Sequence, residues 1–329
     1  MLVLTARDVR RALPMRAAIE AMKMAYAALS DGRAEVPLRT RLPVLPHDGL
    51  SLFMPAYAHA PGGEALAVKV VSLFPGNPSR GLAYIQAAVL LLESSTGVTL
   101  ALLEGSSLTA IRTGAGSGAA IDLLARPESR VVAIFGAGAQ GRTQLEAACT
   151  ARDIRTALIY DSDQDKALAF ADEMAGRAPI PTDLRVAASA REAVENADVI
   201  CTATTSTTPV FVDAHLRAGA HISAVGAYTP EMQEIPAETI GRAKVVVDSR
   251  SAALAEAGDL IQPMRAGLFD EGHIHAELGE IVLGRKPGRG SADEITYFKS
   301  VGIAVQDAMA AELAFRNAVS MGLGQEVEF

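Results

Sequence analysis

The sequence has few of the residues that disulfide frameworks, metal clusters and membrane spans require. Its 329 residues include two cysteines, Cys149 and Cys201, without C-x-x-C or metal-ligand spacing, so both are interpreted as small buried hydrophobic residues in a reducing compartment. No apolar run approaches the ~20 residues of a membrane-spanning helix, and charged side chains at positions 7–11 interrupt the N-terminus before a signal peptide can form. We therefore expect a cytoplasmic protein that does not bind membranes.

Several catalytic and metal-binding motifs are also absent. The sequence contains no H-E-x-x-H, no G-x-S-x-G and no Cys/His pairing. His273 and His275 flank Ile274, but no third ligand has suitable spacing, so we predict no bound metal. A net charge of −8 with no basic block argues against nucleic acid as a partner. The composition, 50% hydrophobic and 21% charged, is typical of a soluble globular protein long enough for two domains.

One stretch, residues 131–145, combines a short apolar run with a glycine cluster. The run 131–135 is too short for a helix and leads into G-x-G-x-x-G at Gly136, Gly138 and Gly141, after which apolar residues return at helical spacing. In a dinucleotide-binding unit the first glycine permits the turn, the second lets the backbone approach a pyrophosphate, and the third lets the helix pack against the strand. The N–H groups at the helix N-terminus then bind the phosphates.

A second apolar run, 157–160, ends on Asp161, about twenty residues past the third glycine. A carboxylate at this place accepts hydrogen bonds from both ribose hydroxyls and repels a 2′-phosphate, which favours NAD(H). Ser162 and the loop after it leave NADP(H) open. The alternative is a structural glycine turn with Asp161 capping the next loop. Because strand, glycines, helix, strand and acid follow in order, we predict a dinucleotide site.

The rest of the chain has a different pattern of apolar and turn residues from this unit. Residues 5–31 have the periodicity of a helical region that ends at Gly32, and residues 36–103 contain short apolar runs between Pro/Gly turns, which predicts an antiparallel or mixed sheet. Residues 109–124 predict a helix that bridges two domains, and residues 301–319 predict a long helix that returns to the first.

Beyond the bridging helix, β–α alternation is typical of a doubly wound parallel sheet. The strands expected there are 131–135, 157–160, 199–202, 221–225 and 244–247. We therefore predict an α/β protein with a Rossmann doubly wound sheet and a discontinuous α+β substrate domain. The predicted boundaries are 116–299 for the dinucleotide-binding domain, and 1–115 with 300–329 for the substrate domain.

Three cations, Arg41, Lys69 and Arg112, lie within or beside apolar segments of the predicted substrate domain. An arginine fork donates two parallel hydrogen bonds to a carboxylate, so this set near a nicotinamide describes a site for a small α-carboxylate substrate. Taken alone, Lys69 would be interpreted as a solvent-facing strand residue. By composition alone, Asp259, Glu277 and Glu280 are interpreted as helix caps or surface acids, and none of the three is counted among the site residues.

These motifs, with several others in preserved order, resemble the ornithine cyclodeaminase/mu-crystallin family over nearly the whole chain. The matching segments are FMPAY at 53–57, VKVV at 68–71, LTAIRT at 108–113, IFGAGAQ at 134–140, GAHISAVG at 219–226, AELGE at 276–280 and FKSVG at 298–302. The resemblance implies a homodimer built through the non-Rossmann domain, with the active site between domains. It also implies an ornithine cyclodeaminase, an alanine dehydrogenase or a reductase of cyclic ketimines.

The resemblance also implies residue roles. Arg41, Lys69 and Arg112 match the family's contacts to the substrate carboxylate. Glu256 matches an acid beside the substrate in the ketimine reductases, so Lys69 and Glu256 are the candidate catalytic residues that keep the ring nitrogen protonated. The candidate cofactor contacts are Arg112, Thr113, Gly136, Gly138, Ala139, Gln140, Gly141, Asp161, Thr202, Ser223, Ala224, Val225 and Gly226.

Two departures from the family pattern bear on the reaction. Cyclodeaminases carry a glutamate where this chain has Leu52, and an aspartate where it has Tyr228, a candidate substrate contact; archaeal-type alanine dehydrogenases also carry that aspartate. Ornithine cyclisation must oxidise an amine, expel ammonia and move protons, so the missing acids matter. A preformed cyclic imine needs only a docked carboxylate, a protonated nitrogen and an aligned hydride.

We therefore predict NAD(P)H-dependent reduction of a cyclic ketimine carboxylate. The candidate substrates are Δ1-pyrroline-2-carboxylate and Δ1-piperideine-2-carboxylate, which would give L-proline and L-pipecolate. Two alternatives stay open: a cyclodeaminase or alanine dehydrogenase acting on an amino acid with the same scaffold, and a non-catalytic small-ligand-binding protein like the family's crystallins.

Overall fold

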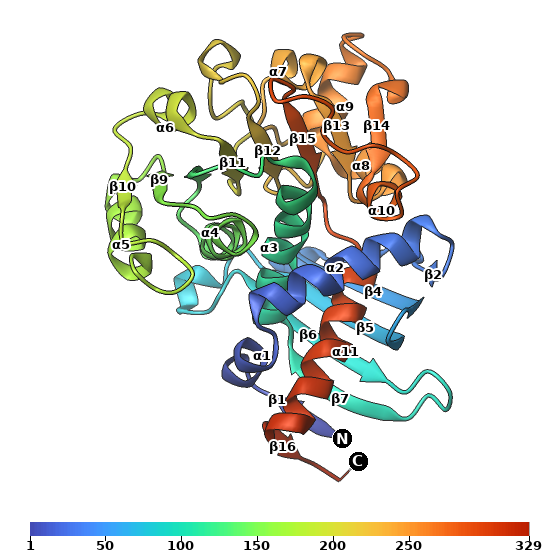
Figure 1. Cartoon of the computed structure of the whole chain (residues 1–329). Coiled ribbons are helices and arrows are strands. Elements are labelled where there is room, and N and C mark those ends of the chain that lie inside the picture. The colour runs from blue at the N-terminus through green and yellow to red at the C-terminus, as the bar shows by residue number, and fades with distance from the viewer. Residues whose placement is uncertain (329) are drawn as a thin grey trace. The chain divides into compact units, whose positions relative to one another are not determined.

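The structure is a computed structural model that describes residues 1–328. The chain forms two units, coloured by residue number in Figure 1. Unit 1 comprises Met1–Arg112 and the C-terminal segment from Ile303, and unit 2 comprises Thr113–Gly302. Among the described residues, no helix combines the length and apolar content that crossing a bilayer requires.

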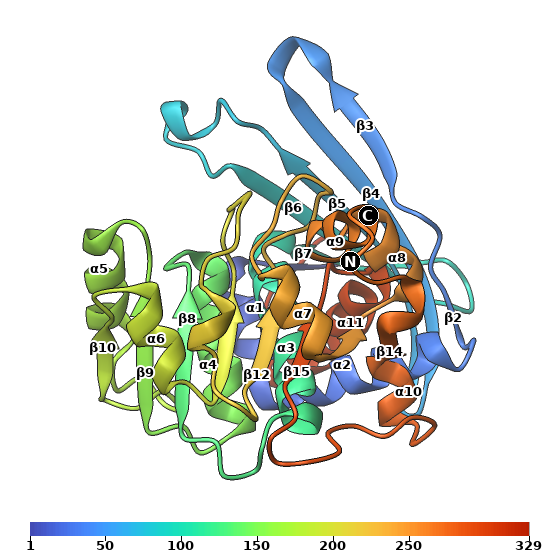
Figure 2. The ribbon, with the colours of Figure 1, turned by 90° about the horizontal axis from the view of Figure 1, so that it is seen from above.

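Unit 1 is built on an eight-stranded mixed sheet in the order β16-β1-β7-β6-β5-β4-β2, with β3 paired to β4. Its strands are β1 (Leu2–Leu4), β2 (Ala34–Glu35), β3 (Thr40–Val44), β4 (Gly49–Ala60), β5 (Gly63–Leu73), β6 (Ile85–Leu92), β7 (Thr99–Glu104) and β16 (Gln325–Glu326). Strands β4 to β7 pair antiparallel in sequence order, and β1 adds to β7 in parallel. The predicted mixed sheet is confirmed, and Figure 2 shows the long β3–β4 hairpin of this unit.

The helices of unit 1 include α1 (Ala6–Ala12), α2 (Met15–Ser30) and α11 (Ala304–Met321). The helical region expected at residues 5–31 is two helices, because Pro14 cannot donate an N–H group within a helix and stands at the cap of α2. Helices α2 and α11 pack on one face of the sheet, where alternate residues of β5 from Ala65 to Val71 are buried. The opposite face keeps half-buried apolar side chains.

Unit 2 contains an eight-stranded sheet in the order β10-β9-β8-β11-β12-β15-β13-β14, with every pair parallel. The strands are β8 (Val131–Phe135), β9 (Thr156–Tyr160), β10 (Leu184–Val186), β11 (Val199–Thr202), β12 (His221–Ala224), β13 (Lys244–Val247), β14 (Ile274–Glu277) and β15 (Thr296–Lys299). Central strands such as β11 and β12 are buried along their whole length, as expected when both faces carry helices. The predicted doubly wound sheet is confirmed.

Helices connect the strands of unit 2 and are visible around them in Figures 1 and 2. They are α4 (Ala139–Ala151), α5 (Gln164–Met174), α6 (Ala190–Asn196), α7 (Ala237–Arg242), α8 (Arg250–Glu256), α9 (Gly258–Arg265) and α10 (Leu278–Val282). The five strands expected from the sequence are all present. Strand β15 was not expected, and it lies between β12 and β13 although it follows both in sequence.

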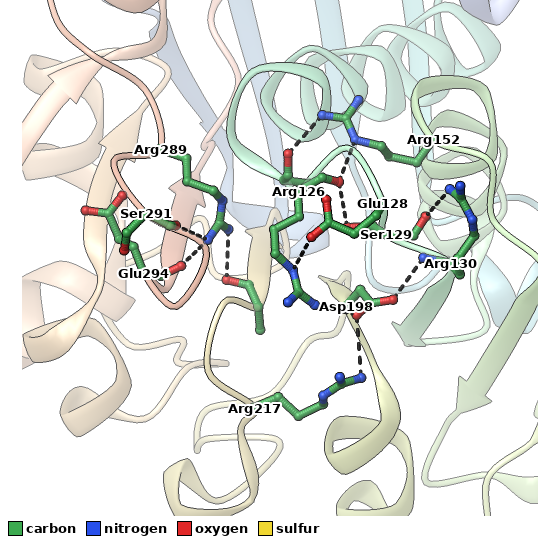
Figure 3. Close-up of polar contacts among 12 residues, drawn as sticks. Arg126, Glu128, Ser129, Arg130, Arg152, Asp198, Arg217, Arg289, Ser291 and Glu294 are labelled. Carbon is green, nitrogen blue, oxygen red and sulfur yellow. Dashed lines mark hydrogen bonds and ion pairs between the residues drawn. The ribbon is translucent and has the colours of Figure 1, made fainter.

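Helix α3 (Gly105–Leu124) ends among arginine side chains, which Figure 3 shows in close-up. Arg152 donates to the carbonyl oxygens of Ala125 and Arg126, each at 3.0 Å, and Arg289 donates to that of Leu124 at 2.7 Å. Cations at a helix C-terminus satisfy carbonyls that have no partner within the helix and interact favourably with its dipole. This arginine cluster therefore fixes the end of α3 within unit 2.

Candidate functional site

The glycine loop of unit 2 follows β8 and begins α4. Gly136 has a φ of +100°, and a Cβ atom on Gly141 would lie 2.1 Å from the carbonyl oxygen of Gly136. The first glycine therefore makes the turn and the third allows close packing of helix against strand. By contrast, apart from Gly138 and its two chain neighbours, no atom of residues 1–328 lies within 4 Å of a Cβ placed on Gly138, the N-terminal cap of α4. This open approach to a helix N-terminus fits a dinucleotide pyrophosphate.

A cavity of about 740 Å³ extends from this loop along the carboxyl ends of the neighbouring strands. Asp161 lines it, and its Oδ2 atom accepts a hydrogen bond from the N–H of Ala137 at 2.8 Å, while Oδ1 accepts from Asp163 at 3.0 Å. Asp161 thus ties the glycine loop to the end of β9. An ionised carboxylate offers about four acceptor positions, so two remain for the hydroxyls of a ribose.

The other predicted cofactor contacts of unit 2 lie mainly at the same edge of its sheet. Gly136, Gly138 and Asp161 line the cavity, while Ala139, Gln140 and Gly141 form the first turn of α4. Five further contacts end or follow β11, which pairs with β8, and β12, which pairs with β11: Thr202, Ser223, Ala224, Val225 and Gly226. Thr113 lies beside α4, because its carbonyl oxygen accepts from Gln144 at 3.5 Å. Arg112 belongs to unit 1.

A buried carboxylate that the sequence analysis missed connects two loops at this edge. Glu234 is fully buried, and its Oε1 atom accepts from the backbone N–H and the hydroxyl of Thr204 at 2.7 and 2.9 Å. Its Oε2 atom accepts from the N–H groups of Gly226 and Ala227 at 2.7 and 3.2 Å. Burial raises the pKa of Glu234. Thr204 lines the cavity, so the hydrogen bonds from Thr204 to Glu234 fix the position of part of the cavity wall.

Asp259 belongs to the same hydrogen-bond network, and its position differs from the one expected from the sequence. Its Oδ1 atom accepts from the N–H groups of Glu234 and Ile235, and its Oδ2 atom pairs with the ammonium of Lys299 at 2.9 Å. Asp259 and Lys299 are both fully buried, so the interpretation of Asp259 as a cap or surface acid is wrong. Its partners lie 24 to 40 residues away in sequence, and no local pattern indicates them.

Glu277 and Glu280 behave as the sequence predicts, since together they form a capping box at the N-terminus of α10. Cys149 and Cys201 are buried, also as predicted, and burial raises the pKa of the Cys149 thiol to about 12. Within residues 1–328, no three His, Cys, Asp or Glu side chains are grouped so that they could hold a metal ion.

The cation cluster of unit 1 forms around a carboxylate on α11. Lys69 lies on the helix-covered face of β5 and is 2% exposed, so the solvent-facing alternative does not hold. Its ammonium lies 2.7 Å from Oδ2 of Asp307, and Nε of Arg112 lies 2.9 Å from Oδ1 of the same residue. Lys69 and Arg112, far apart in sequence, therefore share one buried partner, which the sequence analysis did not identify.

The environment of Lys69 lowers its pKa from 10.5 to about 7. Burial is the main cause, and the nearby charge of Arg112 contributes in the same direction. Asp307 opposes both effects by stabilising the ammonium. Lys69 therefore changes its protonation state near neutral pH.

The predicted Arg41 lies on β3, in the same unit as this cluster. It is exposed on β3 and pairs with Leu52, which is 7% exposed on β4. The structure instead adds Arg39, whose charge lowers the pKa of Lys69. Continuing the β3–β4 register by one pair would set Arg39 opposite Met54, the strand partner of Lys69, so the pairing register is the signal that could have indicated it.

Glu256 and Tyr228 lie on neighbouring segments of unit 2. Glu256 is the last residue of α8 and is partly exposed, and Tyr228 is 37% exposed just after Ala227. A Cβ atom on Gly258 would lie 2.7 Å from the carbonyl oxygen of Thr229, so the turn after α8 packs against the loop that carries Tyr228.

A doubly wound sheet with this glycine loop and an acid at the end of β9 defines a nicotinamide-dinucleotide-binding protein of the oxidoreductase class. The family model of the ornithine cyclodeaminase/mu-crystallin family matches residues 1–322. The chain belongs to this family, which confirms the resemblance seen in the sequence.

Three relatives illustrate this membership. A Δ1-pyrroline-2-carboxylate reductase from Bacillus cereus is 44% identical over 330 residues, covering 100% of both chains. The solved structure of Thermococcus litoralis Δ1-pyrroline-2-carboxylate reductase, in complex with NADH and L-proline, has a TM-score of 0.93 and 46% identity, and the match covers 99% of this chain and 100% of that one. An archaeal alanine dehydrogenase dimer with bound NAD has a TM-score of 0.91 and 34% identity, with 100% and 99% covered.

Proposed function

We propose that this protein reduces the C=N bond of a cyclic ketimine carboxylate, with Δ1-pyrroline-2-carboxylate as substrate and L-proline as product. The observation that carries the proposal is the buried pair of cations, Lys69 and Arg112, in a chain whose other unit has a dinucleotide cavity. Leu52 and Tyr228 supply no acid for the proton transfers of ornithine deamination. The sequence identity of 44% and 46% to two reductases of this substrate, over 100% and 99% of this chain, supports the same conclusion.

The two cations bind the substrate carboxylate. Arg112 donates from Nε to Asp307 at 2.9 Å and from Nη1 to Gln306 at 3.0 Å. Its Nη2 group takes part in neither of these two hydrogen bonds. We assign Nη2 of Arg112 and the ammonium of Lys69 to the two carboxylate oxygens, with Arg39 or Arg41 adding positive charge. Binding in a buried site makes such charged hydrogen bonds strong, so they fix the orientation of the ring.

The imine carbon becomes electrophilic when the ring nitrogen carries a proton. Lys69, with a pKa of about 7, can hold or return a proton near neutral pH, and Glu256 is the second candidate for this role. The glycine loop and Asp161 would hold the dinucleotide, which would supply the hydride that reduces the C=N bond. The protein's residues therefore orient the ring and keep its nitrogen protonated.

NADH is the cofactor that the cavity favours. Asp161 presents a carboxylate at the end of β9, which accepts from ribose hydroxyls and repels the 2′-phosphate of NADPH. Lys166, which also lines the cavity, would attract a phosphate, so NADPH is the second candidate.

We also propose that the protein is a homodimer formed through unit 1. Val68, Leu90 and Leu102 lie opposite one another on β5, β6 and β7, on the face of the sheet away from α11. Leu102 is 36% exposed and Phe53, on the same face, is 37% exposed. A second copy covers such an apolar face, and a related alanine dehydrogenase is a dimer. The free buried cysteines fit the cytoplasm, where we place the protein.

The test is the loss of nicotinamide absorbance when the purified protein meets Δ1-pyrroline-2-carboxylate, with NADH and NADPH run separately. Rapid oxidation with L-proline as product is expected. Reduction of NAD by L-alanine, or release of ammonia from L-ornithine, without reaction on the imine would instead assign the protein to the dehydrogenase or cyclodeaminase reaction. Binding of the imine without any turnover would indicate a non-catalytic protein.

A further inference from the structure

We infer that Asp307 is a positioning residue for this reduction, because its two carboxylate oxygens hold Lys69 and Arg112 at the spacing required by a substrate carboxylate. The inference rests on the proposed function and names a residue that acts through the two cations. Oδ2 lies 2.7 Å from Nζ of Lys69, and Oδ1 lies 2.9 Å from Nε of Arg112. The Asp307 side chain is 2% exposed, so water does not screen either contact.

Asp307 is well suited to hold this geometry because it lies in the first turn of a long helix. An acid there interacts favourably with the helix dipole and has a fixed backbone. The preceding residue, Gln306, accepts from Arg112 through Oε1 at 3.0 Å and donates to the hydroxyl of Tyr26 at 2.7 Å. Residues from β5, α3, α11 and α2 therefore meet in one buried network around the cations.

The charges around Lys69 explain why a carboxylate is needed there. Arg112 faces Lys69 from α3, Asp307 faces it from α11, and Arg39 acts on it from the segment before β3. These three cations, of which Lys69 and Arg112 are buried and Arg39 is half-buried, repel one another, and Asp307 is the anion that offsets this repulsion before substrate binds. Without that anion, the ammonium of Lys69 would lose its proton at a lower pH and would no longer be held in place.

Asp307→Asn tests this role, since it removes the charge and keeps the shape. We expect kcat/KM at pH 7 to fall by about 10²-fold, as for a misplacement of about 1 Å in a reacting site. We also expect the alkaline fall of the kcat/KM profile, which reports groups of the free enzyme and free substrate, to move to lower pH. The nitrogen of the free substrate has the same pKa in the assays of the wild type and of Asp307→Asn. Any difference between the two pH profiles therefore reports a titrating group of the protein.

Gln306→Leu is the matched control, because the Gln306 side chain hydrogen-bonds Arg112, Tyr26 and the N–H of Ile303 rather than Lys69. This variant should raise KM and leave the pH profile in place. NADH binding, measured by fluorescence titration, should be unchanged in both variants and shows that unit 2 is folded. If Asp307→Asn does not fold, Asp307→Glu keeps the charge and should retain the wild-type pH profile with a higher KM.

The outcomes separate this inference from the proposed function. If the wild-type protein does not oxidise NADH with the imine, the proposed function is wrong. If the wild type is active and Asp307→Asn matches it in rate and profile, Asp307 does not position the cations. The inference is also overturned if Asp307→Asn lowers kcat/KM without shifting its pH profile, which is the result expected for Gln306→Leu. A shift of the pH profile in Asp307→Glu as large as that in Asp307→Asn would overturn it as well.

Discussion

Replacing Gly141 with alanine would place a Cβ atom 2.1 Å from the carbonyl oxygen of Gly136 and 3.4 Å from Cγ2 of Ile134. Carbon atoms pack at about 3.5–4.0 Å, so α4 would have to move away from β8 by roughly 1 Å or more. Overpacking of this kind costs about 1–3 kcal/mol. For a unit of this length, that cost corresponds to a fall in Tm of about 2–12 °C in the absence of nucleotide.

Gly138→Ala is the matched comparison in the same loop. Apart from residues 137–139, no atom of the described chain lies within 4 Å of the added Cβ atom, and the φ of −86° suits alanine. We therefore expect a stability change within about 1 kcal/mol, as for a change of N-cap residue. The methyl group would nevertheless occupy the space that a pyrophosphate needs, and NADH affinity should fall at least tenfold, or about 1.4 kcal/mol.

Differential scanning calorimetry with and without NADH distinguishes the two effects. Saturating NADH should raise the Tm of the wild type, because a ligand that binds only the folded state stabilises it, and should raise that of Gly138→Ala much less. Wild-type NADH binding by Gly138→Ala would refute the assignment of this loop to the pyrophosphate. Equal stability of the Gly141→Ala and Gly138→Ala proteins would refute the packing argument.

Three further predictions follow from the site and from the sheet of unit 1. Lys69→Met should lower kcat/KM by about 10²-fold or more, the effect of ~3 kcal/mol from a lost buried charge contact, with NADH affinity unchanged in a fluorescence titration. Asp161→Ser should shift the ratio of kcat/KM for NADH over NADPH at least tenfold, about 1.4 kcal/mol, toward NADPH, and an unchanged ratio would remove Asp161 from cofactor selection. Val68→Glu should give a monomer in light scattering, whereas Val98→Glu, at a 58%-exposed position, should leave the dimer intact; a Val68→Glu dimer would contradict the proposed interface.

The buried acids of unit 2 show how a cofactor site can depend on residues that never reach the ligand. Glu234 receives hydrogen bonds from Thr204, Gly226 and Ala227, and Asp259 holds the backbone of Glu234 in turn. Lys299 supplies the compensating positive charge. Such a network fixes the loops at the ends of β11 and β12 before a nucleotide arrives, which lowers the ordering cost of binding.

The sequence by itself determined the dinucleotide unit, because its parts are contiguous. A strand, the glycines, a helix and Asp161 follow one another within about thirty residues, and each glycine has a requirement that a local pattern expresses. The alternation of apolar residues likewise indicated the mixed sheet of unit 1. The same local patterns correctly predicted the cap formed by Glu277 and Glu280.

Tertiary structure alone decided the surroundings of the cations. Alternation along β5 shows which residues share a face with Lys69, but the face becomes buried only because α11 returns from the far end of the chain and brings Asp307 with it. Strand register likewise decided that Arg39 acts on Lys69, and the insertion of β15 brought Lys299 to Asp259. These contacts join segments distant in sequence, and a buried charge is stable only where such a partner reaches it, so no local pattern could reveal them.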